Sequence, residues 1–179
     1  MQKLPPNFDK TIIRSHLQRL FDIFLPSVLP HLRRNFVEPL PTVNNCLVEG
    51  LLNLLDTFIN LYIDIDDGSE KKTKEEINDF VDQIEPVFMF CFTWSVCCTV
   101  SAPYRKMMNE FIRIEMHSNQ IKFPMPEADE HGNHLSIYDT SYDIIQKKWV
   151  LWNDTVDPYK FDAKLSFSDL IVPTKDSVC

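Results

Sequence analysis

Glycine is scarce in this sequence: only 3 of its 179 residues are glycine, whereas 12 are proline. A loop that cradles phosphates needs glycines at fixed spacing, and neither G-x-x-x-x-G-K-[ST] nor G-x-G-x-x-G occurs in the chain. Proline instead favours helix ends and rigid corners. We therefore expect this chain alone to hold no nucleoside triphosphate.

Positive charge is also in short supply. The chain carries 18 Lys and Arg residues against 26 Asp and Glu residues, which gives a formal net charge of −8. Its longest basic run, Lys71, Lys72 and Lys74, lies among glutamates. Nucleic acids and anionic membranes attract clusters of Lys and Arg, so we expect neither as a partner.

The most apolar stretch is too short to predict a membrane span. No charge interrupts the sequence between Glu85 and Arg105, but a spanning helix needs about 20 predominantly apolar residues. Amphipathic helical patterns also adjoin this stretch on both sides. We interpret it as the second half of a helix that is buried on most of its circumference, followed by a tight corner.

The cysteines and histidines form no metal or disulfide pattern. The five cysteines are Cys46, Cys91, Cys97, Cys98 and Cys179. Their number is odd and no C-x-x-C occurs, so we expect reduced core thiols, Cys179 excepted, in a cytosolic protein. His131 and His134 share a loop and residues 64–69 are rich in aspartate, but neither group supplies a full ligand set. We therefore expect no metal.

Apolar residues recur at helical spacing through most of the first 118 residues. The pattern predicts about five helices, near residues 8–25, 27–36, 43–62, 73–98 and 101–113. Pro26 should end the first helix, Pro86 should kink or interrupt the fourth, and Ser101 should cap the fifth. Thr73 and Glu76 form a capping box before the fourth helix. The expected fold is a mainly α helical bundle with a core that includes Leu20, Phe21, Leu51, Leu54, Phe58, Phe88, Trp94 and Phe111.

The character of the chain changes after residue 118. Residues 119–135 are polar and contain proline, which predicts a mobile loop. Within residues 137–152, β-forming residues flank a short polar gap, which predicts a small hairpin. Three segments are thus expected: a helical domain over 1–118, the loop over 119–135, and the hairpin with an extended connector over 136–179. An isolated hairpin is marginal in water, so it should pack on the helices or on another body.

Three stretches of this chain, in order, resemble dynein heavy chains. The first spans residues 20–55 and includes PTVNNCLV; the second spans 90–113 and includes FCFTWSVCC; the third spans 149–176 and includes WVLW and LIVPTKD. The second is similar to the family's F-x-x-x-W-S-x-G-G pattern, except that Cys97 and Cys98 replace the glycine pair. Cysteine is small enough for close packing but would be strained where φ is positive.

The resemblance implies a mechanical part of a microtubule motor. The chain would be the AAA+ lid-like helical domain of the second AAA+ module and the connector into the third. Its sequence is more similar to axonemal heavy chains than to cytoplasmic ones, which implies a place in the cytoskeleton of a cilium or flagellum. ATP or ADP with Mg would be held by neighbouring AAA+ large domains, which are also its expected partners. The lid itself would be non-catalytic. By its position, Arg105 is implied as the sensor-2-like cation that a lid offers to nucleotide.

Two other functions stay open from the residues. A free-standing helical adaptor would bind a partner helix in an apolar groove. A small hydrolase would use Cys97 or Cys98 as nucleophile, but the five histidines are scattered and none has a recognisable catalytic context. The motor interpretation further predicts a Walker A motif on both sides of this chain in the complete protein.

Overall fold

The computed structural model describes residues 10–65, 74–122 and 124–155. Its helices are α1 (Lys10–Asn35), α2 (Asn44–Ile65), α3 (Lys74–Ser95) and α4 (Arg105–Ser118), and its strands are β1 (Thr140–Asp143) and β2 (Lys148–Leu151). Short 3-10 turns cover Cys97–Thr99, Ala102–Tyr104 and Trp152–Thr155. The mainly α fold with a small hairpin is thus confirmed. The expected capping box and acidic loop (66–69 and Thr73), and the connector from residue 156, lie outside the described residues.

The prediction that Pro26 ends the first helix is wrong, because α1 runs through both Pro26 and Pro30. The buried residues Leu20, Phe24, Val28 and Leu32 continue at intervals of four across both prolines, each with no exposed surface. Both prolines are on the exposed side of the helix, where water can satisfy the carbonyls that lose a partner. Burial of one continuous apolar face therefore outweighs the proline penalty, and the described residues contain four α-helices where about five were expected.

Helix α3 is the centre of the bundle. It packs against both α1 and α2, and every residue from 83 to 93 is buried. Pro86 lies inside the helix without ending it. The hydroxyl of Thr93 donates to the Met89 carbonyl (2.9 Å), which satisfies the one hydroxyl in this apolar run. The expectation of a helix buried around its circumference therefore matches the structure.

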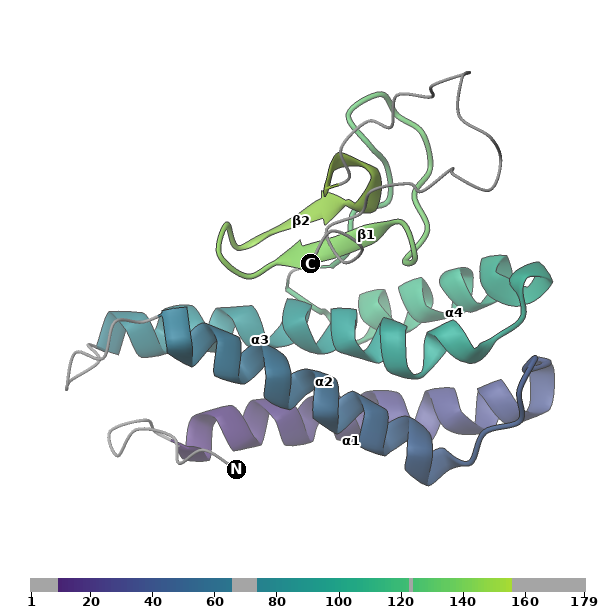
Figure 1. The fold of residues 1–179 in the computed structure, drawn as a ribbon, viewed down its shortest axis with the longest axis horizontal. Helices are drawn as coiled ribbons and strands as arrows, with labels where there is room; N and C mark the ends of the chain where they lie inside the picture. The colour runs from purple at the N-terminus through teal and green to yellow at the C-terminus, as the bar shows by residue number, and fades with distance from the viewer. Residues whose placement is uncertain (1–9, 66–73, 123, 156–179) are drawn as a thin grey trace, which may run out of the picture.

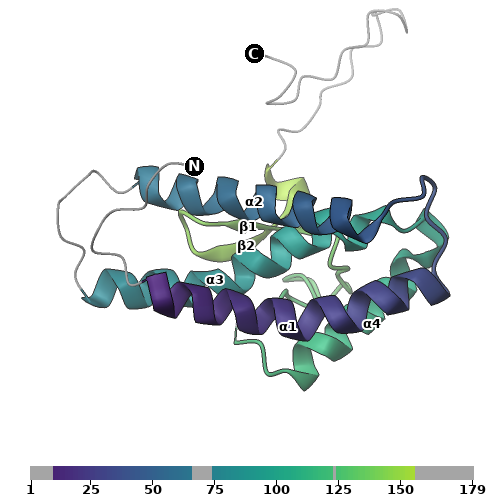
Figure 2. The same ribbon diagram turned by 90° about the horizontal axis from the view of Figure 1, so that it is seen from below.

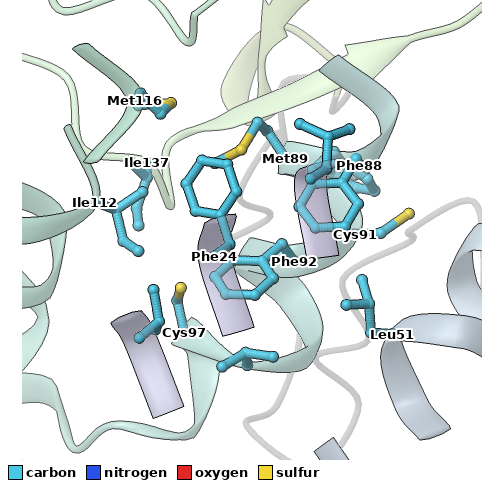
Figure 3. Packing of buried hydrophobic residues seen from close by; sticks show 14 of the residues in the cluster. Phe24, Leu51, Phe88, Met89, Cys91, Phe92, Cys97, Ile112, Met116 and Ile137 are labelled. Carbon is cyan, nitrogen blue, oxygen red and sulfur yellow. The ribbon is translucent and has the colours of Figure 1, made fainter. Parts of the chain in front are cut away.

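Three phenylalanine rings form the middle of the core (Figure 3). The rings of Phe24, Phe88 and Phe92 lie 5.5–5.8 Å apart between centroids and come from α1 and α3. Of the residues expected in the core, Leu20, Leu51 and Phe88 have no exposed surface, whereas Phe21, Leu54, Phe58, Trp94 and Phe111 are partly buried and pack against the core. The ring cluster thus joins α1 and α3, which are far apart in sequence.

The hairpin lies on the side of α3 that faces away from α1 (Figure 1). β1 and β2 pair antiparallel, with Thr140 opposite Leu151 and Asp143 opposite Lys148. The Tyr142 hydroxyl donates to the buried side chain of Gln83 on α3. The ring of Trp152 meets that of Trp94 edge to face at 5.7 Å between centroids. The helices thus supply the support that a two-stranded hairpin needs.

A buried carboxylate joins three parts of the bundle. Glu85 on α3 is 5% exposed, and its Oε1 accepts a hydrogen bond from Arg19 on α1 at 2.9 Å. Its Oε2 accepts the Lys122 backbone N–H at 2.8 Å. The Arg19 guanidinium also donates to the Asn119 carbonyl just after α4 (3.1 Å). Figure 2, which views the bundle from below, shows α4 running from the corner at the end of α1 back toward the middle of the molecule.

Candidate functional site

The N-terminus of α4 carries the residue that the sequence singles out. Two 3-10 turns lead from α3 into α4, and Arg105 is its first residue. The predicted Ser101 cap is wrong, because no side chain caps this helix or the 3-10 turn before it. The Tyr104 N–H instead bonds the Ser101 carbonyl (2.9 Å), since a tight backbone turn occupies the place of the cap. The backbone N–H of Ser101 donates to the carbonyl of Val37, just after α1 (3.0 Å), and this bond fixes the corner between α3 and α4.

Arg105 lies against an aromatic ring. Its guanidinium carbon is 5.3 Å from the centroid of the Tyr138 ring, within the range of a cation–π contact. The Tyr138 hydroxyl donates to the Cys97 carbonyl at 2.8 Å. Burial raises the pKa of Tyr138, so the phenol keeps its proton and stays a donor. The Arg105 side chain is exposed, and so remains available to an outside anion.

Arg105 borders an open polar groove between α4 and the segment after it. The groove has a volume of about 740 Å³ and is lined mainly by polar side chains. Its lining residues are Arg105, Lys106, Asn109, Glu110, Arg113, Glu127, His134, Leu135, Ser136, Tyr138 and Asp139. Acidic and basic side chains alternate here, so the groove by itself is not an anion pocket.

Arg113 organises the segment that the sequence predicts to be a simple loop. Its guanidinium donates to the carbonyls of Met125 (3.1 Å), Pro126 (3.0 Å) and Leu135 (2.8 Å). Burial lowers the pKa of Arg113, while the neighbouring carboxylates of Glu127 and Asp139 oppose that shift. Sequence reasoning missed this role. The available signal was its position eight residues after Arg105, with Asn109 between them on the same helical face.

The described residues contain no cluster of three or more His, Cys, Asp or Glu side chains that could hold a metal. His131 and His134 are both exposed and lie in a tight turn closed by Asp129. The Asp129 carboxylate accepts hydrogen bonds from the Asn133 side chain (2.8 Å) and from the backbone N–H groups of Asn133 (2.8 Å) and His131 (2.9 Å), and these bonds lower its pKa. The turn is therefore explained by local hydrogen bonds. In the part of the chain that is described, no helix is long and apolar enough to cross a bilayer.

The three cysteines in and just after α3 do not form a nucleophilic site. Cys91 and Cys97 are fully buried, and burial raises the pKa of Cys91 to about 12 and that of Cys97 well above its usual value. Cys98 is half-buried, its pKa is also raised by burial, and its thiol donates to the Trp94 carbonyl. Because the thiolate is the nucleophile, these thiols are inert at neutral pH. The Cys pair is also unstrained, since the positive-φ residues of the described chain other than glycine are Gln120 and Lys147.

The expectation that Cys46 is a core thiol is wrong, because Cys46 is exposed in the first turn of α2. The buried face of α2 runs through Leu47, Leu51 and Leu55, and Cys46 lies beside it. The apolar stripe read from the sequence is thus wider than the surface that other elements cover. This difference gives the cysteines distinct reactivities.

Alkylation of the native chain at neutral pH should separate the cysteines. We expect iodoacetamide to modify Cys46 and to leave Cys91 and Cys97 unmodified, because Cys46 is exposed whereas the other two thiols are buried. Peptide mass spectrometry after a short pulse gives the measurement, and the same pulse in urea is the control that labels all three. Native labelling of Cys97 at the rate of Cys46 would contradict this assignment and revive a thiol nucleophile.

The comparisons with known proteins agree on one family. The family model described as "Dynein heavy chain AAA lid domain" matches residues 17–154. This match includes α1 from its second turn, the whole bundle, the polar groove and the hairpin. No solved structure matches the chain.

Several curated relatives are similar along nearly the whole chain. Dynein axonemal heavy chain 1 of Homo sapiens is 29% identical over 188 residues, which cover 99% of this chain and 4% of the relative. Its counterpart from Mus musculus is 28% identical over 89% of this chain and 4% of the relative. The dynein gamma chain of the flagellar outer arm of Chlamydomonas reinhardtii is 24% identical, over 89% of this chain and 3% of the relative. The chain thus spans about 4% of the length of its first relatives.

Proposed function

Because this chain belongs to the dynein heavy chain AAA lid domain family, we propose that it is the lid of an AAA+ module in an axonemal dynein heavy chain and couples nucleotide state to movement of the motor ring. The observation that carries the proposal is the family match over residues 17–154. The similarity to axonemal heavy chains over 99% of the chain supports a place in the cytoskeleton of a cilium or flagellum.

The bundle has the properties that such a lid needs. A lid transmits motion only if it moves as a rigid body, and α3 is buried from residue 83 to 93 between α1, α2 and the hairpin. The Glu85 contacts tie α1, α3 and the end of α4 together. Displacement of the α4 N-terminus would therefore carry the other helices with it.

We further propose the position of the lid and its contact with nucleotide. The order of the three stretches that resemble dynein heavy chains supports the second AAA+ module, with residues 136–179 leading into the third. ATP or ADP with Mg would be held by neighbouring AAA+ large domains, and the exposed Arg105 would meet the nucleotide phosphates as a sensor-2-like cation. The lid would contribute positioning and no catalytic step.

Arg105→Ala should weaken nucleotide binding at the module that this lid covers. A hydrogen bond to a charged group contributes roughly 1.5–3 kcal/mol, so the apparent affinity should fall about 10- to 100-fold. The measurement is photolabelling of the full heavy chain with 8-azido-ATP over a range of concentrations. Mass spectrometry of the labelled peptides measures labelling at this module's nucleotide pocket separately from labelling at the other modules.

Arg14→Ala is the matched charge control. Arg14 is exposed near the start of α1, 22 residues before Phe36, whose ring lies 6.0 Å from that of Tyr104 beside Arg105. At about 1.5 Å per helical residue, Arg14 is therefore some 30 Å along α1 from the corner that bears Arg105. Removal of its charge should leave labelling and microtubule gliding unchanged, whereas Arg105→Ala should also slow gliding. Equal labelling curves for both variants would refute the nucleotide contact.

The adaptor alternative is favoured by one observation. Met107 (51% exposed) and Ile114 (62% exposed) lie on one face of α4 with the partly buried Phe111 between them. An adaptor predicts such a face without intramolecular cover. The lid proposal assigns the same face to a neighbouring part of the heavy chain. A stoichiometric partner captured outside any heavy-chain complex would favour the adaptor.

A further inference from the structure

One face of α4 carries three polar side chains that contact residues 135–138, the segment just before the hairpin. Arg105, Asn109 and Arg113 are four residues apart, so they share that face. Arg105 lies over the Tyr138 ring, while the Asn109 Oδ1 accepts the N–H of Ile137, the residue before Tyr138, at 2.9 Å. Arg113 binds the Leu135 carbonyl at 2.8 Å. Helix α4 therefore carries Arg105 and also binds the backbone of the segment that contains Tyr138.

The ring of Tyr138 is fixed from its other side as well. Its hydroxyl donates to the Cys97 carbonyl in the corner after α3 (2.8 Å). Its ring packs edge to face with Trp94, with 6.4 Å between centroids and an interplanar angle of 80°. Ile137 beside it has no exposed surface and anchors the backbone in the core. Tyr138 thus belongs to the rigid part of the bundle, whereas the Arg105 side chain extends into solvent.

We propose that Tyr138 is the positioning residue for Arg105: its ring holds the guanidinium at the mouth of the groove, ready for the phosphates of a nucleotide on the neighbouring large domain. This inference rests on the proposed nucleotide contact of Arg105. A free arginine loses most of its rotamer freedom when it binds an anion, and that loss weakens binding. A guanidinium already resting on a fixed ring has lost part of that freedom beforehand.

The test uses the full heavy chain and the same site-resolved 8-azido-ATP labelling. Tyr138→Leu removes the ring face, and the apparent affinity should fall about two- to five-fold, the effect of one cation–π contact at an exposed site. Tyr138→Phe keeps the ring face but loses the hydroxyl bond to the Cys97 carbonyl, so it should lose less affinity than Tyr138→Leu. In an Arg105→Ala background, Tyr138→Leu should have no further effect, because the coupling requires both partners.

Each outcome bears on one of the two proposals. If Arg105→Ala weakens labelling but Tyr138→Leu does not, the positioning role is refuted and the nucleotide contact stands. The positioning role is also refuted if Tyr138→Phe loses as much as Tyr138→Leu, or if Tyr138→Leu loses the same factor without Arg105, since both results indicate a general disturbance of the corner. If Arg105→Ala itself has no effect, the nucleotide contact fails and the positioning role fails with it.

Discussion

Phe88→Ala should remove about 3–5 kcal/mol from the free energy of unfolding, the range for loss of a buried aromatic ring. Phe88 has no exposed surface, and its ring contacts those of Phe21, Phe24 and Phe92 at 5.4–5.8 Å between centroids. The deletion therefore leaves a cavity where α1 and α3 meet. A domain of this size has a total stability of about 5–15 kcal/mol, so the variant should be close to unfolding. Urea unfolding followed by far-ultraviolet circular dichroism measures the loss.

The control for this deletion is Leu52→Ala. Leu52 is also apolar and helical, but it is 51% exposed on α2 beside the fully buried Leu51. Alanine there should change the free energy of unfolding by no more than about 0.5 kcal/mol, as for most surface substitutions. A loss below about 1 kcal/mol for Phe88→Ala, or one equal to that of Leu52→Ala, would mean that the ring cluster does not hold α1 on α3.

The sequence predicts the elements well where apolar spacing alone decides them. The stripe through Leu47, Leu51 and Leu55 predicts α2, and the uncharged stretch after Glu85 predicts the buried half of α3. Both inferences depend on periodicity within one element. The resemblance to dynein heavy chains predicts the family for a similar reason, because it depends on the order of short patterns along the chain.

Inferences that depend on contacts between elements were less successful. Pro26 was expected to end a helix, since local proline chemistry opposes one, but the apolar face through Phe24 and Val28 is buried on both sides of it. Cys46 was expected in the core, since its spacing fits the stripe, but it is exposed in the first turn of α2. The position of Arg105 at the groove follows from the corner between α3 and α4. Its role toward nucleotide stays a prediction.

Arg113 shows most clearly what spacing cannot reveal. A polar, proline-containing segment such as residues 119–135 predicts a loop, and its backbone groups need partners that the sequence does not name. The structure provides three of them from a single side chain on α4, which binds the carbonyls of Met125, Pro126 and Leu135. Only the fold brings these carbonyls within reach of one guanidinium. Three carbonyls of the segment therefore share one partner that lies 12 to 22 positions earlier.

Arg113→Met should release this segment while leaving the bundle folded. Methionine retains apolar bulk but donates no hydrogen bond, so three carbonyls lose their shared partner. Hydrogen bonds to a charged group contribute roughly 1.5–3 kcal/mol each, but an opened loop regains water, so we expect a total loss of about 2–4 kcal/mol. Amide hydrogen exchange should show that this loss of stability is confined to the segment. The N–H groups of Leu135 and Ile137, which bond Glu127 and Asn109, should lose protection while those of α3 keep it.

Two variants of the same helix sharpen this prediction. Lys106→Met also replaces a cation by methionine, at an exposed position in the first turn of α4, and it should leave exchange at Leu135 and Ile137 unchanged. Arg113→Lys keeps the charge but replaces a planar fork by a single ammonium, which cannot reach all three carbonyls at once, so protection should fall part of the way. Unchanged exchange in Arg113→Met would show that the buried Ile137 alone holds the segment. In that case Tyr138 would keep its place under Arg105 without Arg113, and the two ends of the α4 polar face would be independent of each other.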